Sequence, residues 1–128
     1  MRYLLDTHIV IWAMVGSAKL SAKARAILEN PENILYVSSA SIWEISIKNA
    51  LKPSDIPITS EQMIRFCRDS GIIELPVRFC HSQRVSTVPM HHNDPFDRML
   101  VAQAMEDGLS LMSHDGKLPA YGDMVLLV

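Results

Sequence analysis

Four carboxylates in this sequence could together form one reactive site: Asp6, Glu44, Asp97 and Asp115. None of them has an obvious arginine partner that would neutralise its charge. Carboxylates that are crowded together repel one another, and a divalent cation removes that conflict. Mg²⁺ and Mn²⁺ are the ions that prefer oxygen ligands. The residue types therefore predict a metal centre, provided that the fold brings these distant acids to one place.

Each acid also has a purely structural interpretation. Asp6 ends the apolar run Tyr3-Leu-Leu and could cap the helix that follows. Asp115 precedes a glycine, and Asp-Gly after a strand is an ordinary turn. Glu44 could form an exposed ion pair with Lys48, four residues later on one helical face. Taken one at a time, these acids leave structure and function open, and only their convergence would favour a site.

Asp94 and Asp97 lie at the start of one predicted helix. Asp94 is its natural N-cap, and Asp97 occupies the third helical position, where negative charge suits the helix dipole. However, Leu100 and Val101 follow Asp97 at the spacing of one helical face, which places its carboxylate above an apolar, buried stripe. Burying a carboxylate costs free energy unless a partner or a metal holds it. We therefore expect a cap at Asp94 and a site residue at Asp97.

The histidines give weaker signals. His91 and His92, with Asp94, are compatible with a zinc site, but no third and fourth ligand stand at a recognisable spacing. We expect surface histidines there instead. His8 and His114 each neighbour a predicted site acid, so either could contact a substrate or tune an acid.

The predicted elements alternate between short strands and helices, which indicates an α/β fold with a mainly parallel sheet. Parallel strands bind ligands beyond their carboxyl ends, and Asp6 and Asp115 both follow strand ends. We predict strands over residues 2–5, 34–37, 72–75, 109–113 and 124–128, and helices over 8–15, 21–29, 39–51, 59–71, 81–85 and 94–108.

Length and composition fit one globular domain spanning residues 1–128, with a net charge of −2. A protein that binds a phosphate backbone by its own charge would be basic, so bound cations must supply the positive charge if this chain binds RNA.

Cys67 and Cys80 have no metal-ligand spacing and indicate reduced thiols. The longest apolar run, residues 9–15, is too short for a membrane span. We expect a cytoplasmic protein.

Four blocks of the sequence resemble PIN-domain proteins of the VapC toxin type. They are Tyr-Leu-Leu-Asp-Thr-His-Ile-Val-Ile-Trp at 3–12, Ser-Ser-Ala-Ser-Ile-Trp-Glu-Ile-Ser-Ile-Lys at 38–48, His-His-Asn-Asp-Pro-Phe-Asp-Arg-Met-Leu-Val-Ala-Gln-Ala at 91–104, and Leu-Met-Ser-His-Asp at 111–115. The blocks occur in the family's order and cover nearly the whole chain. The resemblance implies a three-layer α/β/α sandwich around a mainly parallel sheet.

The resemblance also implies an activity and the residues that perform it. PIN-domain members are Mg²⁺- or Mn²⁺-dependent endoribonucleases, and their acids fall on Asp6, Glu44, Asp97 and Asp115, of which Asp6, Asp97 and Asp115 hold the metal. Asp94, Thr7 and Ser113 are expected to support the site, and Lys48 and Arg98 to hold the RNA backbone. Serine at 113 stands where the family more commonly has threonine, and it keeps the hydroxyl group.

VapC-type members are toxins that a small antitoxin holds inactive, and they commonly dimerise. The helix over 39–51 is apolar around most of its circumference, with Trp43 and Ile47 on one ridge, and Trp12 and Met14 add to the apolar surface. We therefore expect a homodimer and a groove for an apolar antitoxin segment. The alternatives are a PIN-fold module that binds RNA or a partner without catalysis, and a nuclease that processes RNA outside a toxin system. A phosphoaspartyl receiver is disfavoured because Asp6-Thr7-His8 lacks the paired acids.

Overall fold

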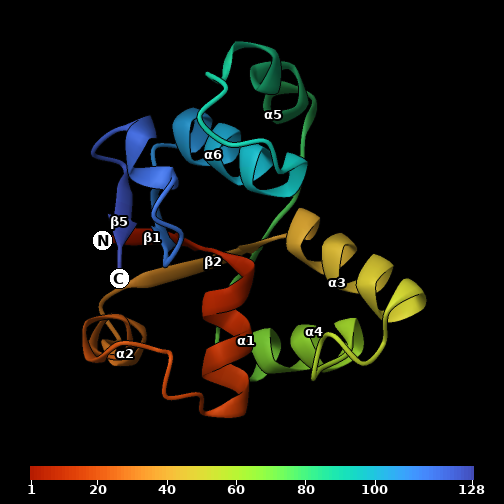
Figure 1. Ribbon diagram of the computed structural model, residues 1–128. Coiled ribbons are helices and arrows are strands. Elements are labelled where there is room, and N and C mark those ends of the chain that lie inside the picture. Colours follow the sequence, from red (N-terminus) through yellow and green to blue (C-terminus); the bar gives the residue numbers. More distant parts are fainter.

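The computed structural model describes residues 1–128 as five strands, six α-helices and two short 3₁₀ helices. Figure 1 shows their arrangement. In chain order they are β1 (Arg2–Leu5), α1 (Thr7–Val15), α2 (Ala22–Glu29), β2 (Ile34–Ser38), α3 (Ser39–Leu51), α4 (Ser60–Asp69), β3 (Ile73–Leu75), α5 (Phe79–Arg84), η1 (Val85–Thr87), α6 (Pro95–Asp107), β4 (Ser110–Ser113), η2 (Leu118–Tyr121) and β5 (Val125–Leu127).

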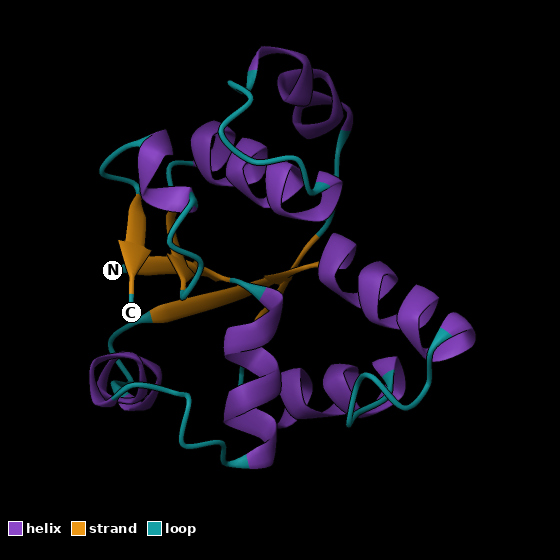
Figure 2. Cartoon of the chain, viewed as in Figure 1, coloured by secondary structure: helices purple, strands orange, loops and turns teal.

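The five strands form one sheet in the order β3-β2-β1-β4-β5, and all four strand pairs are parallel. The predicted α/β fold with a mainly parallel sheet is confirmed. The first strand lies in the middle of the sheet, between β2 and β4. Because these three strands are parallel, the segments that follow them begin at the same edge of the sheet. Figure 2 shows the strands at the centre of the molecule with helices around them.

Helices cover both faces of the sheet, which makes the predicted three-layer sandwich. Successive side chains of a strand point to opposite faces. Leu4 and Leu111 accordingly pack in the cluster that includes Leu100 of α6, whereas Leu5 and Met112 pack in the cluster formed with α1 to α4. Figure 1 shows α5 and α6 on one side of the strands and α1, α2 and α4 on the other.

Most helix ends follow local chemistry that the sequence predicts. The side chain of Ser21 accepts a hydrogen bond from the backbone of Ala24 at the start of α2, and Thr59 and Gln62 form a capping box on α4. Gly108, with φ of 64°, ends α6 in the left-handed conformation that glycine adopts without strain.

The boundaries differ from the predictions by one or two residues in most cases. The helix predicted over 81–85 begins earlier, as α5, and ends at Arg84. The 3₁₀ helices η1 and η2 were not predicted, and η2 lies between the last two strands. No helix is long and apolar enough to cross a membrane. Both cysteines are free thiols.

Candidate metal centre

The site begins where β1 and β4 end side by side. The two strands are parallel, with Leu5 paired to Met112, so the residues that follow them are neighbours. The backbone N–H of Asp6 continues the ladder by donating to the carbonyl of Met112 over 2.9 Å. The Ser113 hydroxyl then donates to Oδ2 of Asp6 over 2.6 Å. The sheet register therefore joins two residues that are 107 positions apart in the sequence.

All four predicted acids line one cavity of about 280 Å³. Asp6 follows β1, Glu44 comes from α3, Asp97 from the first turn of α6, and Asp115 follows β4. Asp94 also lines this cavity. The convergence that the sequence predicted is therefore present, and it draws on four separate segments of the chain.

Asp6 is the N-cap residue of α1, yet its carboxylate caps nothing. The structure contains no side-chain hydrogen bond from Asp6 to the first turn of the helix, and only 5% of the residue is exposed. Burial raises the pKa of Asp6 above its usual value, against the opposing effect of the hydrogen bond from Ser113. Because the carboxylate of Asp6 is buried and does not cap the helix, the interpretation of Asp6 as a helix cap no longer applies.

Glu44 does form the predicted ion pair, but it is buried. Lys48 Nζ lies 2.7 Å from its Oε2, and the Thr7 hydroxyl donates to its Oε1 over 3.0 Å. Thr7 is itself buried and also lies 2.9 Å from the Ser41 hydroxyl. Glu44 is only 5% exposed, which differs from the exposed stripe of an ordinary surface pair. Thr7 and Lys48 therefore fix both of its oxygens at the cavity wall.

Asp97 carries the clearest electrostatic signature. Its pKa is raised to about 7, first by burial and then by the negative charges of Asp6 and Asp94. His92 lowers the pKa and Glu44 raises it, by smaller amounts. The neighbouring acids therefore repel the ionised form of Asp97, as expected for crowded carboxylates without a cation.

His92 lies among the acids, where we expected a surface histidine, and that prediction was wrong. Its Nε2 lies 2.8 Å from Oδ2 of Asp115 and 3.3 Å from Oδ2 of Asp97. Its Nδ1 accepts a hydrogen bond from the backbone N–H of Asp94 over 3.0 Å. Because Nδ1 is the acceptor, the neutral ring carries its proton on Nε2 and donates it to the carboxylates. His92 is therefore held as a donor.

Asp115 is both a turn residue and part of the cavity. Its Oδ1 accepts from the backbone N–H of Lys117 over 2.9 Å, as in an Asx turn. Burial alone would raise the pKa of Asp115, but the hydrogen bonds from Lys117 and His92 outweigh it and lower the pKa. Two donors thus fix the orientation of this carboxylate.

The donor set fits a hard divalent cation. The ligand atoms of His92, Asp97 and Asp115 all lie within 4.8 Å of one another. Since His92 presents an N–H there, the atoms that can bind a cation are carboxylate oxygens. Burial, together with the negative charges of Asp6 and Asp94, raises the pKa of Asp97, and a bound cation would offset these effects. Oxygen ligands of this kind suit Mg²⁺ and Mn²⁺.

The remaining predicted residues divide between the cavity and other positions. Lys48 lines the cavity. Asp94 caps α6, accepting hydrogen bonds from the backbones of Phe96 and Asp97. Arg98 is not brought to the acids. Its guanidinium donates to the backbone carbonyls of Val85, Val88 and Pro89 and holds that loop against α6.

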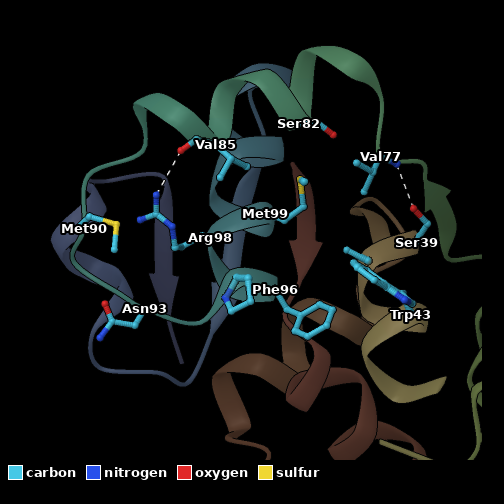
Figure 3. Close-up of a pocket in the computed structure, with 12 residues that line it drawn as sticks. Ser39, Trp43, Val77, Ser82, Val85, Met90, Asn93, Phe96, Arg98 and Met99 are labelled. Carbon is cyan, nitrogen blue, oxygen red and sulfur yellow. Dashed lines mark hydrogen bonds between the residues drawn. The ribbon is translucent and has the colours of Figure 1, made fainter. Parts of the chain in front are cut away.

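A second cavity of about 660 Å³ lies between α3, α6 and the segment that includes η1 (Figure 3). Apolar side chains make up much of its wall, and the rings of Trp43 and Phe96 meet edge to face across it with centroids 5.4 Å apart. Trp43 precedes Glu44 and Phe96 precedes Asp97, so α3 and α6 contribute walls to both cavities. Arg98 lies in this second cavity.

Comparisons with known proteins agree with this architecture. The family model described as PIN domain matches residues 3–123. Among curated proteins, no sequence matches the chain. Three similar solved structures share the fold, at sequence identities of 20% or less.

The VapBC2 complex from Rickettsia felis, solved with a fragment of promoter DNA, has a TM-score of 0.70 at 12% identity and covers 100% of this chain and 98% of that one. A toxin–antitoxin complex from Klebsiella pneumoniae has a TM-score of 0.65 at 20% identity, covering 97% and 95%. VapC20 from Mycobacterium tuberculosis, described as a toxin that cleaves the sarcin-ricin loop, has a TM-score of 0.65 at 14% identity, covering 94% and 95%.

Proposed function

This chain belongs to the PIN domain family, and from that premise we propose that it is a divalent-cation-dependent endoribonuclease acting as the toxin of a toxin–antitoxin pair. The observation that carries the proposal is the meeting of Asp6, Glu44, Asp97 and Asp115 in one cavity. VapC20, which has the same fold, is described as a toxin that cleaves the sarcin-ricin loop. The whole chain would form one nuclease domain.

The chain's acids would hold Mg²⁺ or Mn²⁺ through Asp6, Asp97 and Asp115, with help from Glu44. A bound cation would supply positive charge to the scissile phosphate and lower the pKa of the attacking water. In this account the carboxylates are ligands and not nucleophiles. The negative charge of the acids alone would repel RNA, which explains why a chain with a net charge of −2 requires a cation.

Neighbouring hydrogen bonds keep the acids in place for this role. Ser113 orients Asp6, Thr7 orients Glu44, and His92 orients Asp115. Partners of this second layer fix the ligand geometry that a cation needs. Lys48 is half-exposed at the rim, with 40% of its side chain accessible, and could also contact the phosphate backbone.

The apolar cavity provides a place for the antitoxin. Trp43 and Met90 expose 63% and 69% of their surface, which is costly for large apolar side chains unless a partner covers them. A helix or extended segment with apolar anchors would suit this groove. Because α3 and α6 also border the acids, the same segment could place a basic side chain among them and compete with the cation.

Exposed apolar side chains elsewhere support the proposed homodimer. Phe79 is 96% exposed and Leu51 is 75% exposed, and they lie outside the apolar cavity. Light scattering on the isolated chain tests this part, since a strict monomer at micromolar concentration would contradict it.

The nuclease activity is tested with purified chain and a mixed RNA substrate. We expect no cleavage in a chelator, restored cleavage when Mg²⁺ or Mn²⁺ is returned, and little cleavage of DNA of the same sequence. Failure to cleave any RNA with either cation would favour a binding module without catalysis. The toxin role is tested by co-purification with the product of an adjacent gene, which should bind the chain and suppress that cleavage.

A further inference from the structure

Three aromatic side chains share the cavity with the acids: His8, Trp12 and His114. The ring of Trp12 is close to both of the others, with its centroid 5.9 Å from that of His8 and 5.2 Å from that of His114. Trp12 is the one hydrophobic residue in a lining that is otherwise polar. The cavity therefore has an acidic part and an aromatic part.

The same strand ends position both parts. His8 and Trp12 are four residues apart on α1, so they lie on one face of the helix that Asp6 precedes. His114 comes between β4 and Asp115. Its Nδ1 lies 2.6 Å from the carbonyl oxygen of Val128, so Nδ1 donates and Nε2 is left as a free acceptor. The hydrogen bond to Val128 therefore holds the His114 ring, and α1 places His8 and Trp12 next to the acids.

None of these rings holds an acid in place through a hydrogen bond. The donors to the four acids are Ser113, Thr7, Lys48, His92 and the backbone of Lys117. The inner side of Trp12 packs against the core beside α1, while His8 and His114 are exposed. Core packing accounts for one side of the indole, and it leaves the side towards the cavity unexplained.

Because the rings of His8 and His114 are inclined to that of Trp12 by 52° and 75°, one base could stack on only one of the three rings, and the indole of Trp12 is the largest. A flat aromatic face beside a phosphate-binding site suits a nucleobase. Bases stack on aromatic side chains with about 1–3 kcal/mol of stabilisation each, with little dependence on base identity. A base inside a duplex is already stacked, and proteins that read RNA in this way take unpaired nucleotides.

We propose that Trp12, with His8 and His114 beside it, forms a stacking subsite for one unpaired nucleobase next to the phosphate held at the acids, and that the base stacks on the indole. This inference rests on the proposed function, because the acids must first bind a phosphate through a cation. Such a subsite would give the chain a preference for single-stranded or extruded nucleotides.

The test uses adenosine 5′-monophosphate, which carries a phosphate and a base but has no phosphodiester bond to cut. Ribose 5-phosphate lacks the base and is the matched ligand control. Trp12 and Trp43 are the only tryptophans, so Trp43→Phe leaves Trp12 as the fluorescent reporter and Trp12→Phe leaves Trp43. With Mg²⁺ present, we expect the nucleotide to quench Trp12 and not Trp43, and ribose 5-phosphate to quench neither.

Calorimetry on a second variant tests the energetic contribution. Trp12→Leu should lower the affinity for the nucleotide about tenfold, which corresponds to about 1.4 kcal/mol, and leave that for ribose 5-phosphate unchanged. If Trp12→Leu does not fold, the fluorescence comparison still tests the subsite, because both of its variants keep an aromatic ring at position 12.

Two results would overturn the inference, and they differ in what else they affect. Equal affinity for the two phosphates, with no quenching of Trp12, would reject the stacking subsite and leave the nuclease proposal intact. Failure of both compounds to bind in Mg²⁺, together with no RNA cleavage, would reject the phosphate site and the subsite with it.

Discussion

The hydroxyl of Ser113 donates to the carboxylate of Asp6 over 2.6 Å, at the ends of the neighbouring parallel strands β4 and β1. The same hydroxyl oxygen accepts the backbone N–H of Asp115 over 3.0 Å. One side chain therefore links two of the proposed cation ligands. It also lowers the pKa of Asp6, against the larger effect of burial.

We predict that Ser113→Ala weakens Mn²⁺ binding by roughly 10- to 100-fold, the usual range for loss of a residue that orients a ligand. Titration calorimetry on the metal-free protein measures this. Ser113→Thr keeps the hydroxyl and should bind Mn²⁺ nearly as the parent does. Unchanged affinity in Ser113→Ala would mean that Asp6 needs no such orientation.

Asp97 predicts a pH dependence of stability in metal-free buffer. Its pKa is about 7 in the folded state against 3.8 ordinarily, so between these values the folded protein keeps a proton that the unfolded chain has lost. The free energy of unfolding should therefore fall as pH rises from about 4 to about 7. Asp97→Asn removes this titration, and its stability should fall less over the same window.

At pH 8 without metal, Asp97→Asn should be more stable than the parent by roughly 2–4 kcal/mol, at about 1.4 kcal/mol for each pKa unit. Urea denaturation at several pH values measures both effects. Asp55→Asn, at a residue that does not line the cavity, is the matched control and should follow the parent. A variant that is less stable than the parent at pH 8 would mean that ionised Asp97 is a favourable partner.

His92 predicts a contrast between two substitutions. His92→Gln can keep an N–H donor near the position of Nε2, whereas His92→Ala cannot. Because the ring is held as a donor by the backbone of Asp94, we expect Gln to retain most of the Mn²⁺ affinity and Ala to lose it by about tenfold or more. Equal losses in both variants, measured by calorimetry, would indicate that the imidazole nitrogen itself binds the cation.

Substitutions of Asp94 and Asp97 should differ in their effects on stability and on RNA cleavage. Asp94→Ala removes the cap on α6 and should cost about 1 kcal/mol of stability, while Asp94→Ser keeps a capping oxygen and should cost less. Asp94→Ala should reduce RNA cleavage less than Asp97→Ala does. Equal or greater loss of cleavage in a folded Asp94→Ala protein would show that the two roles are reversed.

Local signals in the sequence were sufficient for much of the fold. The caps at Ser21, Thr59 and Asp94 depend on residues within one turn, and the alternation of strands and helices depends on short apolar runs. The convergence of Asp6 and Asp115 followed from a general property of parallel sheets, because their carboxyl ends share one edge.

The path of the loop before α6 could not be predicted in this way. His92 reaches the acids because the Tyr121 hydroxyl accepts its backbone N–H, and because the guanidinium of Arg98 holds the carbonyls of the preceding loop. Tyr121 belongs to the 3₁₀ helix η2, 29 residues further along. These contacts depend on tertiary packing, which no local pattern encodes.

Glu44 shows a different limit of sequence analysis. The spacing to Lys48 correctly indicated an ion pair, and it suggested an exposed one. In the structure Glu44 is buried while Lys48 is half-exposed, and the hydroxyl of Thr7, from another helix, donates a hydrogen bond to the buried carboxylate. An i, i+4 spacing specifies which side chains meet but not which side of the helix faces solvent.

The most direct measurement of the central claim compares RNA cleavage by the parent with Asp6→Asn, Asp97→Asn and Asp115→Asn, in Mg²⁺ or Mn²⁺ and at matched folding. The account predicts that each variant loses most cleavage. The metal-free melting temperature should equal or exceed that of the parent in Asp6→Asn and Asp97→Asn, because the pKa of both acids is raised, and should fall slightly in Asp115→Asn, because Lys117 and His92 stabilise the ionised carboxylate. Variants that cut RNA like the parent, or that lose activity only because they melt well below it, would contradict a cation centre at these acids.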